Sequence, residues 1–318
     1  IQNDHTDPYF NHAVEEYFMK NSQEECFILW RNVARILIGR NQNTMSEINI
    51  DFIKEHGIKV VRRLSGGGAV FNDLGNINFT FITNKDEDDT INFKKFAQPI
   101  INALGDLGIE AQFSGRNDIT IEGKKFSGNA QYYWKNRVLH HGTLLFSGNL
   151  TDLSAALKTK PLKFEDKSVK SVASRVTNIS QHLQQPMDVL AFREFLREHV
   201  MRANGIARVY EMTAEDLGAI GRLADERFAA WEWNFGSSPK YSFSNEKRFA
   251  GGTIELNMEV SKGFITAIRL YGDFFGEYDI AELERTLIGV RHSEEELRKL
   301  RKFKKLRNTS PIRPRRNS

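Results

Sequence analysis

The chain has 318 residues and a mass of 36.5 kDa, which is enough for one large domain or for a large and a small one. Hydrophobic residues make up 40% of it and charged residues 27%, a balance typical of soluble globular proteins. No run of about 18 apolar residues is present, so no membrane partner is expected. The single cysteine, Cys26, excludes an intrachain disulfide. Together with the lack of a secretory signal pattern after Ile1, it predicts a cytoplasmic protein.

The formal net charge of +4 is unevenly distributed along the chain. Arg298–Ser318 contains ten lysines or arginines and no acid, so the residues before it are acidic overall. We interpret this stretch as a solvated helix end followed by a frayed tail. The alternative is a basic contact with nucleic acid or with an acidic protein. Neither an aromatic platform nor zinc-finger spacing accompanies the charge, so nucleic acid is not expected as a partner.

The first half of the chain alternates between helical and strand patterns. Asp7 and Pro8 predict the N-cap and first turn of an amphipathic helix. The pattern then predicts, in order, one long or two short strands over Phe27–Gly39, a helix over Ser46–His56, a strand over Ile58–Arg63 and a half-buried strand over Asn76–Thr83. The acidic run Lys85–Asp89 is expected to be a solvated loop.

The second half begins with a helix over Phe93–Leu107, which Pro99 is expected to kink or to begin. An antiparallel meander is predicted over Ile109–Phe146, with tight turns at Glu122-Gly123 and Lys135-Asn136. Later predictions are helices over Val189–Ala203 and Ala214–Trp231, strands near Gly252–Val260 and Phe264–Tyr271, and helices near Ile280–Leu287 and Ser293–Phe303.

These elements predict an α+β fold. A large domain over residues 1–243 would hold mostly antiparallel or mixed β-sheets flanked by helices, and a small α+β domain with the basic tail would cover 244–318. The boundary is placed at the Gly-Ser-Ser-Pro sequence after Trp231, because these residues are typical of turns and linkers.

The sequence RRLSGGGAVF, from Arg62 to Phe71, predicts an anion site. Glycine lets the backbone approach a ligand closely, and successive exposed N–H groups hold an anion. Because Arg62 and Arg63 end a strand, their side chains should point to opposite faces, so only one is expected in the site. No GxxxxGK[ST] or GxGxxG pattern is present, which excludes the two common phosphate loops. The alternative is a simple β-hairpin turn.

Three further polar blocks follow: GRND (Gly115–Asp118), KKFSGNAQ (Lys124–Gln131) and HHGT (His140–Thr143). Lys124 and Lys125 alternate across a strand, so one can be solvated while the other faces the anion site and neutralises phosphate charge. Asn117 and Asp118 suit a ribose, an amide or Mg²⁺, or they are turn formers. His140 and His141 are expected to be structural, since no third metal ligand is suitably spaced.

Taken together, the blocks RRLSGGGAVFNDLGNINFTF, GRNDI, KKFSGNA, HHGTLL and SVASRVTNI resemble, in order, those of the lipoate–protein ligase A family. WEWNFGSSPKYSF resembles the end of that family's catalytic domain. The resemblance covers 4–243 clearly and the small domain more weakly. It implies that lipoate and ATP form lipoyl-adenylate and pyrophosphate, and that the lipoyl group then passes to a lysine of a carrier domain. The implied partners are the lipoyl domains of 2-oxoacid dehydrogenase complexes and the glycine-cleavage H protein. The implied cofactors are ATP and Mg²⁺.

The resemblance also assigns roles to individual positions. Lys125, immediately before Phe-Ser-Gly, would be the catalytic residue and touch both the lipoyl carbonyl and the phosphate. Arg63 would contact the nucleotide. Residues that would line the adenylate by backbone contact are Gly68, Ala69, Val70 and Phe71. Further expected contacts with ATP, adenylate or lipoate are Ser65, Gly66, Gly67, Asn117, Asp118, Ser127, Gly128, His141 and Gly142, with Asp118 the candidate Mg²⁺ ligand.

One relative is disfavoured, and three alternatives stay open. Biotin–protein ligases share the fold but carry a GRGRxxR signature that is absent here. Octanoyl-transferases of the superfamily use a catalytic cysteine, whereas Cys26 is expected to be a buried structural thiol at the start of a strand. The chain would otherwise be a ligase for octanoate or another acyl acid, or a non-enzymatic binding module that uses the basic tail. In the family the small domain moves between the two steps, and Gly236-Ser237-Ser238 is a plausible hinge.

Overall fold

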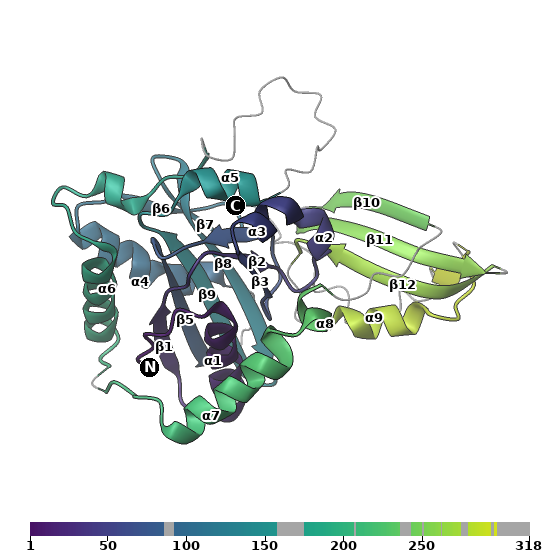
Figure 1. Cartoon of the computed structure of the whole chain (residues 1–318), viewed down its shortest axis with the longest axis horizontal. Coiled ribbons are helices and arrows are strands. Elements are labelled where there is room, and N and C mark those ends of the chain that lie inside the picture. Colours follow the sequence, from purple (N-terminus) through teal and green to yellow (C-terminus); the bar gives the residue numbers. More distant parts are fainter. Residues whose placement is uncertain are drawn as a thin grey trace, which may run out of the picture.

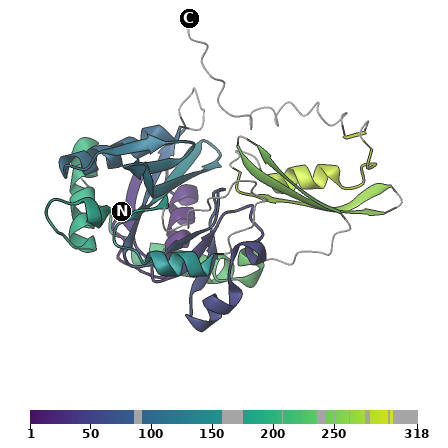
Figure 2. The ribbon, with the colours of Figure 1, turned by 90° about the horizontal axis from the view of Figure 1, so that it is seen from above.

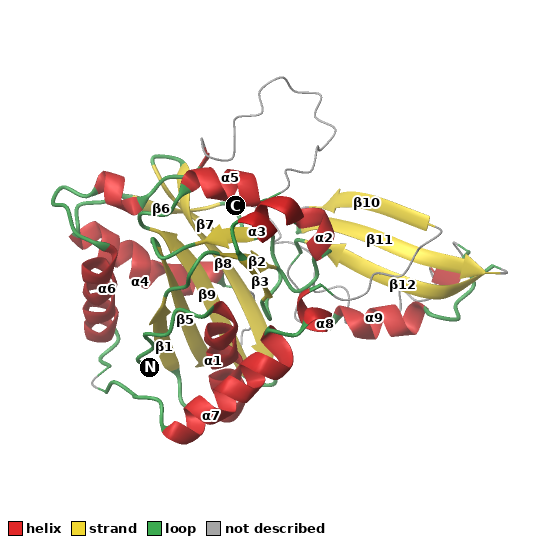
Figure 3. Ribbon diagram, viewed as in Figure 1, coloured by secondary structure: helices red, strands yellow, loops and turns green. Residues whose placement is uncertain are grey.

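The computed structural model describes residues 1–85, 92–157, 175–206, 208–235, 243–249, 251–261, 263–274, 279–293 and 296–297. The large body and the small C-terminal unit lie side by side (Figure 1). No helix among the described residues has the length and apolarity to cross a membrane. The expected mixed α+β class is confirmed, as the arrangement of strands and helices in Figure 3 shows.

A six-stranded antiparallel sheet forms the centre of the large body. Its strands, in spatial order, are β1 (Cys26–Trp30), β5 (Asn76–Asn84), β9 (Arg137–Leu145), β8 (Lys124–Trp134), β7 (Asp118–Ile121) and β6 (Ala111–Ser114). The predicted meander is therefore confirmed. Glu122 and Gly123 both have positive φ, as a two-residue hairpin turn requires.

Helices cover both faces of this sheet (Figure 1). On one face lie α4 (Phe93–Asp106) and α6 (Val189–Ala203); on the other lie α1 (Pro8–Asn21) and α7 (Ala214–Leu223). The prediction of a half-buried strand over Asn76–Thr83 is therefore wrong. Its alternation is real, but Asn78 and Thr80 are buried beneath α1 instead of facing water.

A second sheet of three strands, in the order β3 (Lys59–Arg62), β2 (Arg35–Ile38) and β4 (Val70–Asn72), packs against α3 (Ile50–Glu55) and α5 (Leu150–Ala156). β3 pairs with β2 in parallel and β4 pairs with β2 antiparallel, so the glycine turn crosses from one side of β2 to the other. The alternative of a simple hairpin turn is excluded.

Several predicted boundaries shift. The predicted helix over Ser46–His56 is two short helices, α2 (Thr44–Glu47) and α3, because Ile48 leaves the helix to bridge Leu157. Pro99 lies inside a continuous α4 and does not begin it. The predicted helix over Ala214–Trp231 ends in a π-helical turn, Ala224–Phe228, and α8 (Trp231–Asn234) follows as a separate turn.

The C-terminal unit is an antiparallel sheet of β10 (Phe243–Phe249), β11 (Gly252–Ser261) and β12 (Phe264–Gly272), covered by α9 (Ile280–Leu287) (Figure 2). The sequence analysis missed β10, whose polar stretch Ser244–Arg248 lacks an apolar alternation. The amide of Gly272 donates to the carbonyl of Asn41 at 2.7 Å. The Arg116 guanidinium donates to the carbonyls of Gly251 and Asp273. The unit is therefore held against the two loops that carry Asn41 and Arg116.

Some predicted features lie outside the described residues. They are most of the acidic run Lys85–Asp89, the start of the SVASRVTNI block, the hinge Gly236-Ser237-Ser238, most of the helix near Ser293–Phe303 and the basic tail from Arg298.

Arg62, the first arginine of the glycine-turn block, connects three segments of the large body. It is 9% exposed, and its guanidinium donates to the carbonyls of Gly39, Arg40, Gln42, Trp233 and Asn234 and to the hydroxyl of Thr44. Burial lowers its pKa to about 10, so it remains a cation at neutral pH. It ties the loop after β2 to α8, the last described element before the C-terminal unit.

Replacement of Arg62 by methionine keeps side-chain volume but removes every one of these donors. We expect the free energy of unfolding to fall by roughly 3 kcal/mol, since each buried acceptor left without a donor costs about 1–3 kcal/mol. Urea titration followed by circular dichroism measures the loss. Arg202→Met is the matched control, because Arg202 is 75% exposed and should change stability by less than about 0.5 kcal/mol. Equal stability of the two variants would contradict this role.

Candidate functional site

A cavity of about 130 Å³ lies where the glycine turn meets β8, β9 and α1. Ten of the predicted site residues line it: Arg63, Gly67, Gly68, Ala69, Val70, Asn117, Lys125, Gly128, His141 and Gly142. Pockets for drug-sized ligands occupy about 300–1,000 Å³. The cavity is therefore smaller than the space that a drug-sized ligand usually occupies.

The glycine turn presents bare backbone amides to this cavity. Arg63 is 5% exposed and donates to the carbonyl oxygens of Gly66 and Gly68, both at 2.8 Å. In a trans peptide the next N–H points away from the carbonyl, so the amides of Gly67 and Ala69 point away from Arg63. Among the described residues, none accepts a hydrogen bond from the amides of Gly67, Gly68 or Ala69. These groups form a concavity suited to an anion.

The positive charge of Arg63 lies directly behind the turn. Burial lowers the pKa of its guanidinium to about 10, so it is a cation at neutral pH. It is folded inward onto the turn and also donates to the Ser65 hydroxyl at 3.1 Å. In this structure it therefore shapes the anion cradle from behind, and direct contact with a nucleotide remains a prediction.

Lys125 supplies the second positive charge, from the opposite wall of the cavity. Its ammonium lies 2.7 Å from a carboxylate oxygen of Asp118, and the two side chains are 38% and 37% exposed. The pair is therefore exposed enough for a ligand phosphate to compete with Asp118. A Cβ at Gly128 would lie 3.0 Å from the Lys125 ammonium, so the glycine leaves room for the lysine. Lys124 is exposed, as the predicted alternation requires.

The sequence analysis missed the inner wall of the cavity. It consists of Trp30, Leu37, Val70 and Ala130 as apolar groups, with His12, Asn78, Asn129 and Thr143 as polar ones; only Val70 had been predicted. Trp30 comes from β1 and Leu37 from β2, which belong to different sheets, so their meeting depends on tertiary structure. An apolar slot beside an anion cradle fits a substrate with an alkyl chain and a charged end.

A buried chain of polar side chains runs from α1 to the glycine turn. Glu15 is 2% exposed, and its carboxylate contacts His12 Nδ1 and His141 Nδ1, each at 2.8 Å. His141 Nε2 lies 2.6 Å from the hydroxyl of Ser65. Positions 12 and 15 lie opposite the predicted apolar stripe of the first helix, so helical spacing gave no signal that they are buried.

His140 has a different environment from His141, because adjacent residues on β9 face opposite sides of the sheet. Its ring stacks on Phe96 with centroids 4.7 Å apart, and its nitrogens contact Gln131 and Asn129 at 3.1 Å. Burial lowers its pKa well below the ordinary value, so it is neutral. No group of three or more candidate metal ligands occurs in the described part of the chain.

Five predicted site residues do not line the cavity. Ser65 and Gly66 lie behind the turn as partners of Arg63, and Phe71 packs in the core of the small three-stranded sheet. Asp118 reaches the site only through Lys125, and Ser127 is 1% exposed and accepts a hydrogen bond from Asn129. Contacts from these five to a ligand stay predictions.

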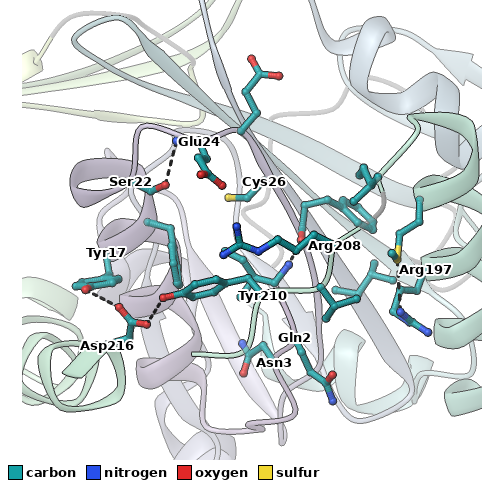
Figure 4. Close-up of a pocket in the computed structure, with 18 of the residues that line it drawn as sticks. Gln2, Asn3, Tyr17, Ser22, Glu24, Cys26, Arg197, Arg208, Tyr210 and Asp216 are labelled. Carbon is teal, nitrogen blue, oxygen red and sulfur yellow. Dashed lines mark hydrogen bonds between the residues drawn. The ribbon is translucent and has the colours of Figure 1, made fainter. Parts of the chain in front are cut away.

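A larger cavity of about 830 Å³ lies on the other side of β1, around Cys26 (Figure 4). Several of its charged groups are already paired: Arg193 with Asp4, and Asp216 with the hydroxyls of Tyr17 and Tyr210. Burial raises the pKa of the Cys26 thiol to about 11, so it is not a thiolate at neutral pH. Cys26 is only partly buried, less than expected, and it does not line the cavity at the glycine turn.

The comparisons with known proteins agree with this geometry. Residues 7–201 match the family model of the lipoyl protein ligase A/B catalytic domain, and residues 238–310 match the bacterial lipoate protein ligase C-terminus. A lipoate-protein ligase of Bacillus subtilis, LplJ, is 46% identical over 290 residues, covering 90% of this chain and 88% of the relative. The chain therefore belongs to the lipoate–protein ligase family, and it is an enzyme of the ligase class.

Solved structures place the fold in the same family. Plasmodium falciparum LipL1, described in complex with lipoate, has a TM-score of 0.80 and 29% identity, covering 95% of this chain and 93% of that one. A lipoate-protein ligase A bound with ATP has a TM-score of 0.65 and 25% identity, covering 74% and 96%. A bipartite ligase from Thermoplasma acidophilum, described with its E2 lipoyl domain, has a TM-score of 0.66 and 28% identity, covering 76% and 97%.

Gly39 supports the glycine turn from beneath. A Cβ there would lie 1.9 Å from the carbonyl oxygen of Gly67, a backbone atom that cannot move cheaply. We expect Gly39→Ala to displace the turn, lower the free energy of unfolding by roughly 1–3 kcal/mol and weaken ATP binding, measured by isothermal titration calorimetry. Gly221→Ala is the control: its Cβ meets nothing within 4 Å on α7, so stability should rise by up to about 1 kcal/mol. Unchanged ATP affinity in Gly39→Ala would contradict the close packing.

Proposed function

We propose that the chain activates lipoate with ATP and transfers the lipoyl group to a lysine of a lipoyl carrier domain. One observation carries the proposal: the cavity combines unpaired amides at Gly67–Ala69, the ammonium of Lys125 and an apolar wall. The family and its solved relatives with lipoate and with ATP support the choice of substrates. Lipoate-dependent release of pyrophosphate from ATP tests the first step.

In the first step a carboxylate oxygen of lipoate attacks the α-phosphorus of ATP, and the bond from that phosphorus to pyrophosphate breaks. Two anions must approach each other, so positive charge and N–H dipoles have to offset their repulsion. The amides of the glycine turn face the phosphate from one side. Lys125 faces it from the other side once Asp118 releases the ammonium.

In the second step the amine of the carrier lysine attacks the acyl carbon of lipoyl-adenylate. AMP leaves with the electrons of the broken acyl–phosphate bond, and the amine proton passes to solvent. We propose acceptors among the lipoyl domains of 2-oxoacid dehydrogenase complexes and the glycine-cleavage H protein. The relative described with its E2 lipoyl domain supports the first group. Mass spectrometry of each acceptor after incubation with enzyme, ATP and lipoate identifies the adduct.

Mg²⁺ fits the site only together with ATP. Asp118 is the one carboxylate close to Lys125 that the described residues provide, and Asn117 already donates to the carbonyl of Asn129. Mg²⁺ is commonly held by one or two carboxylates plus the phosphates of a substrate. Asp118 would then hold the ion, whose charge would offset part of the triphosphate charge.

The proposal also covers domain organisation and location. We propose a catalytic domain over residues 1–243 and an accessory domain over 244–318. The separate apolar cluster of Met258, Ile265 and Ile268 in the C-terminal unit supports this division. We further propose a cytoplasmic location, because the sequence contains a single cysteine and no disulfide framework.

Lys125→Ala removes the ammonium that faces the glycine turn. We expect the rate of lipoate-dependent pyrophosphate release to fall on the order of 10²-fold or more, as for other lost electrostatic donors. Lys124→Ala is the matched control, since Lys124 is the exposed neighbour on the same strand and should keep nearly full activity. Normal activity in Lys125→Ala would show that the catalytic assignment is wrong.

Cys26→Ser distinguishes the ligase from a thioester-forming transferase. The thiol lies outside the cavity, and burial raises its pKa to about 11, so it is neither placed nor ionised for attack. We expect the variant to keep ATP-dependent transfer to a lipoyl-domain acceptor. Loss of transfer, with a covalent acyl-enzyme detected in the wild type, would favour the transferase instead.

A further inference from the structure

The hydrogen-bond partners of Glu15 determine where its neighbours carry their protons. Burial raises the pKa of Glu15, but His141 and His12, with the hydrogen bonds that they donate, lower it below its ordinary value, so the group is a carboxylate. A carboxylate only accepts hydrogen bonds. His12 and His141 must therefore both carry a proton on Nδ1, and the hydroxyl of Thr80, 2.7 Å away, donates as well.

The far nitrogens of the two rings are fixed in turn. His12 Nε2 lies 2.6 Å from the guanidinium of Arg35, which can only donate, so this nitrogen is an acceptor. His141 Nε2 lies 2.6 Å from the Ser65 hydroxyl, which itself accepts from Arg63 at 3.1 Å. The Ser65 hydroxyl can donate its own hydrogen to His141 Nε2 while it accepts from Arg63, so one hydrogen-bonded path joins Glu15 to Arg63.

We propose that Glu15 is a positioning residue of the anion site. It acts through His141 and Ser65 to hold Arg63 and the glycine turn in the geometry that receives phosphate. The inference rests on the proposed function, because it assumes that the turn binds ATP. Glu15 does not line the cavity, whereas His141, Arg63 and the turn do.

The charges around Glu15 explain how a buried carboxylate can serve an anion site. Arg35 is completely buried and also donates to Asn72 and Asn78 at 3.1 and 3.2 Å. Burial lowers its pKa to about 9, so it remains a cation at neutral pH. Glu15 therefore lies between two buried cations. His12 links it to Arg35, and His141 and Ser65 link it to Arg63. The cluster keeps a net positive charge behind the cradle.

Glu15→Gln tests the relay, because an amide has one accepting and one donating end. Whichever way the amide is placed, its NH₂ group faces the Nδ1 proton of His12 or of His141. We expect one of these histidines to move its proton to Nε2, which two-bond ¹H–¹⁵N spectra of the imidazole rings detect. We also expect the KM for ATP in the pyrophosphate-release assay to rise roughly 10–100-fold, the range typical of losing a residue that orients a metal ligand.

Glu16→Gln is the matched control. Glu16 is the neighbouring residue on α1 and equally buried at 2%, but its carboxylate pairs with Lys20 and Arg227 instead of with the histidines. This variant should leave both histidine tautomers and the KM for ATP unchanged. Unchanged tautomers and an unchanged KM in Glu15→Gln would overturn the inference.

Ser65→Ala is a second test that places no unpaired charge in the interior, in case Glu15→Gln fails to fold. It breaks the link between His141 and Arg63, so the KM for ATP should rise while both Nδ1 protons stay in place. A normal KM would overturn the inference. Absence of lipoate-dependent pyrophosphate release in the wild type would instead contradict the proposed function, and the tautomer measurements would stand separately.

Discussion

Two adjacent buried arginines hold the glycine turn and the segments that meet it. Arg62 and Arg63 point to opposite sides of β3, as their positions on a strand require, and both stay charged although burial lowers their pKa to about 10. Arg62 gathers carbonyls from the loop after β2 and from α8. Arg63 gathers the carbonyls of the turn itself. Because the carbonyls of Gly66 and Gly68 accept hydrogen bonds from Arg63, the N–H groups that follow them point away from Arg63. Internal hydrogen bonding therefore produces the concavity suited to an anion.

The cradle is also linked to the C-terminal unit. The loop after β2 contacts the turn through the amide of Arg40, which donates to the carbonyl of Ser65 at 2.9 Å. The same loop accepts a hydrogen bond from Gly272 of the C-terminal unit at Asn41. A displacement of that unit would therefore reach the amides of the glycine turn through one short loop. This connection is a direct structural path between the C-terminal unit and the glycine turn.

The small volume of the cavity agrees with a site that is complete only with its ligands. At about 130 Å³ it is smaller than a usual pocket for a drug-sized ligand, although the glycine turn, Lys125 and an apolar wall already line it. The exposed pair of Lys125 and Asp118 is the contact that a phosphate can most easily replace. The buried chain through Glu15, by contrast, is already joined by hydrogen bonds between Glu15, His12, His141 and Ser65.

The sequence alone determined the local features of this protein. Spacing indicated the strands on either side of the glycine turn, the opposite directions of Arg62 and Arg63, and that one of Lys124 and Lys125 points inward, because these follow from strand geometry within a few residues. The family resemblance selected Lys125. The ordered blocks indicated the family. Tertiary structure decided what lies behind those residues: Glu15 meets His141, and Arg35 meets His12, only because α1 packs over the polar face of β5. Contacts between residues that lie 23 and 126 positions apart leave no local pattern, which is why these buried charges could not be found before the fold was known.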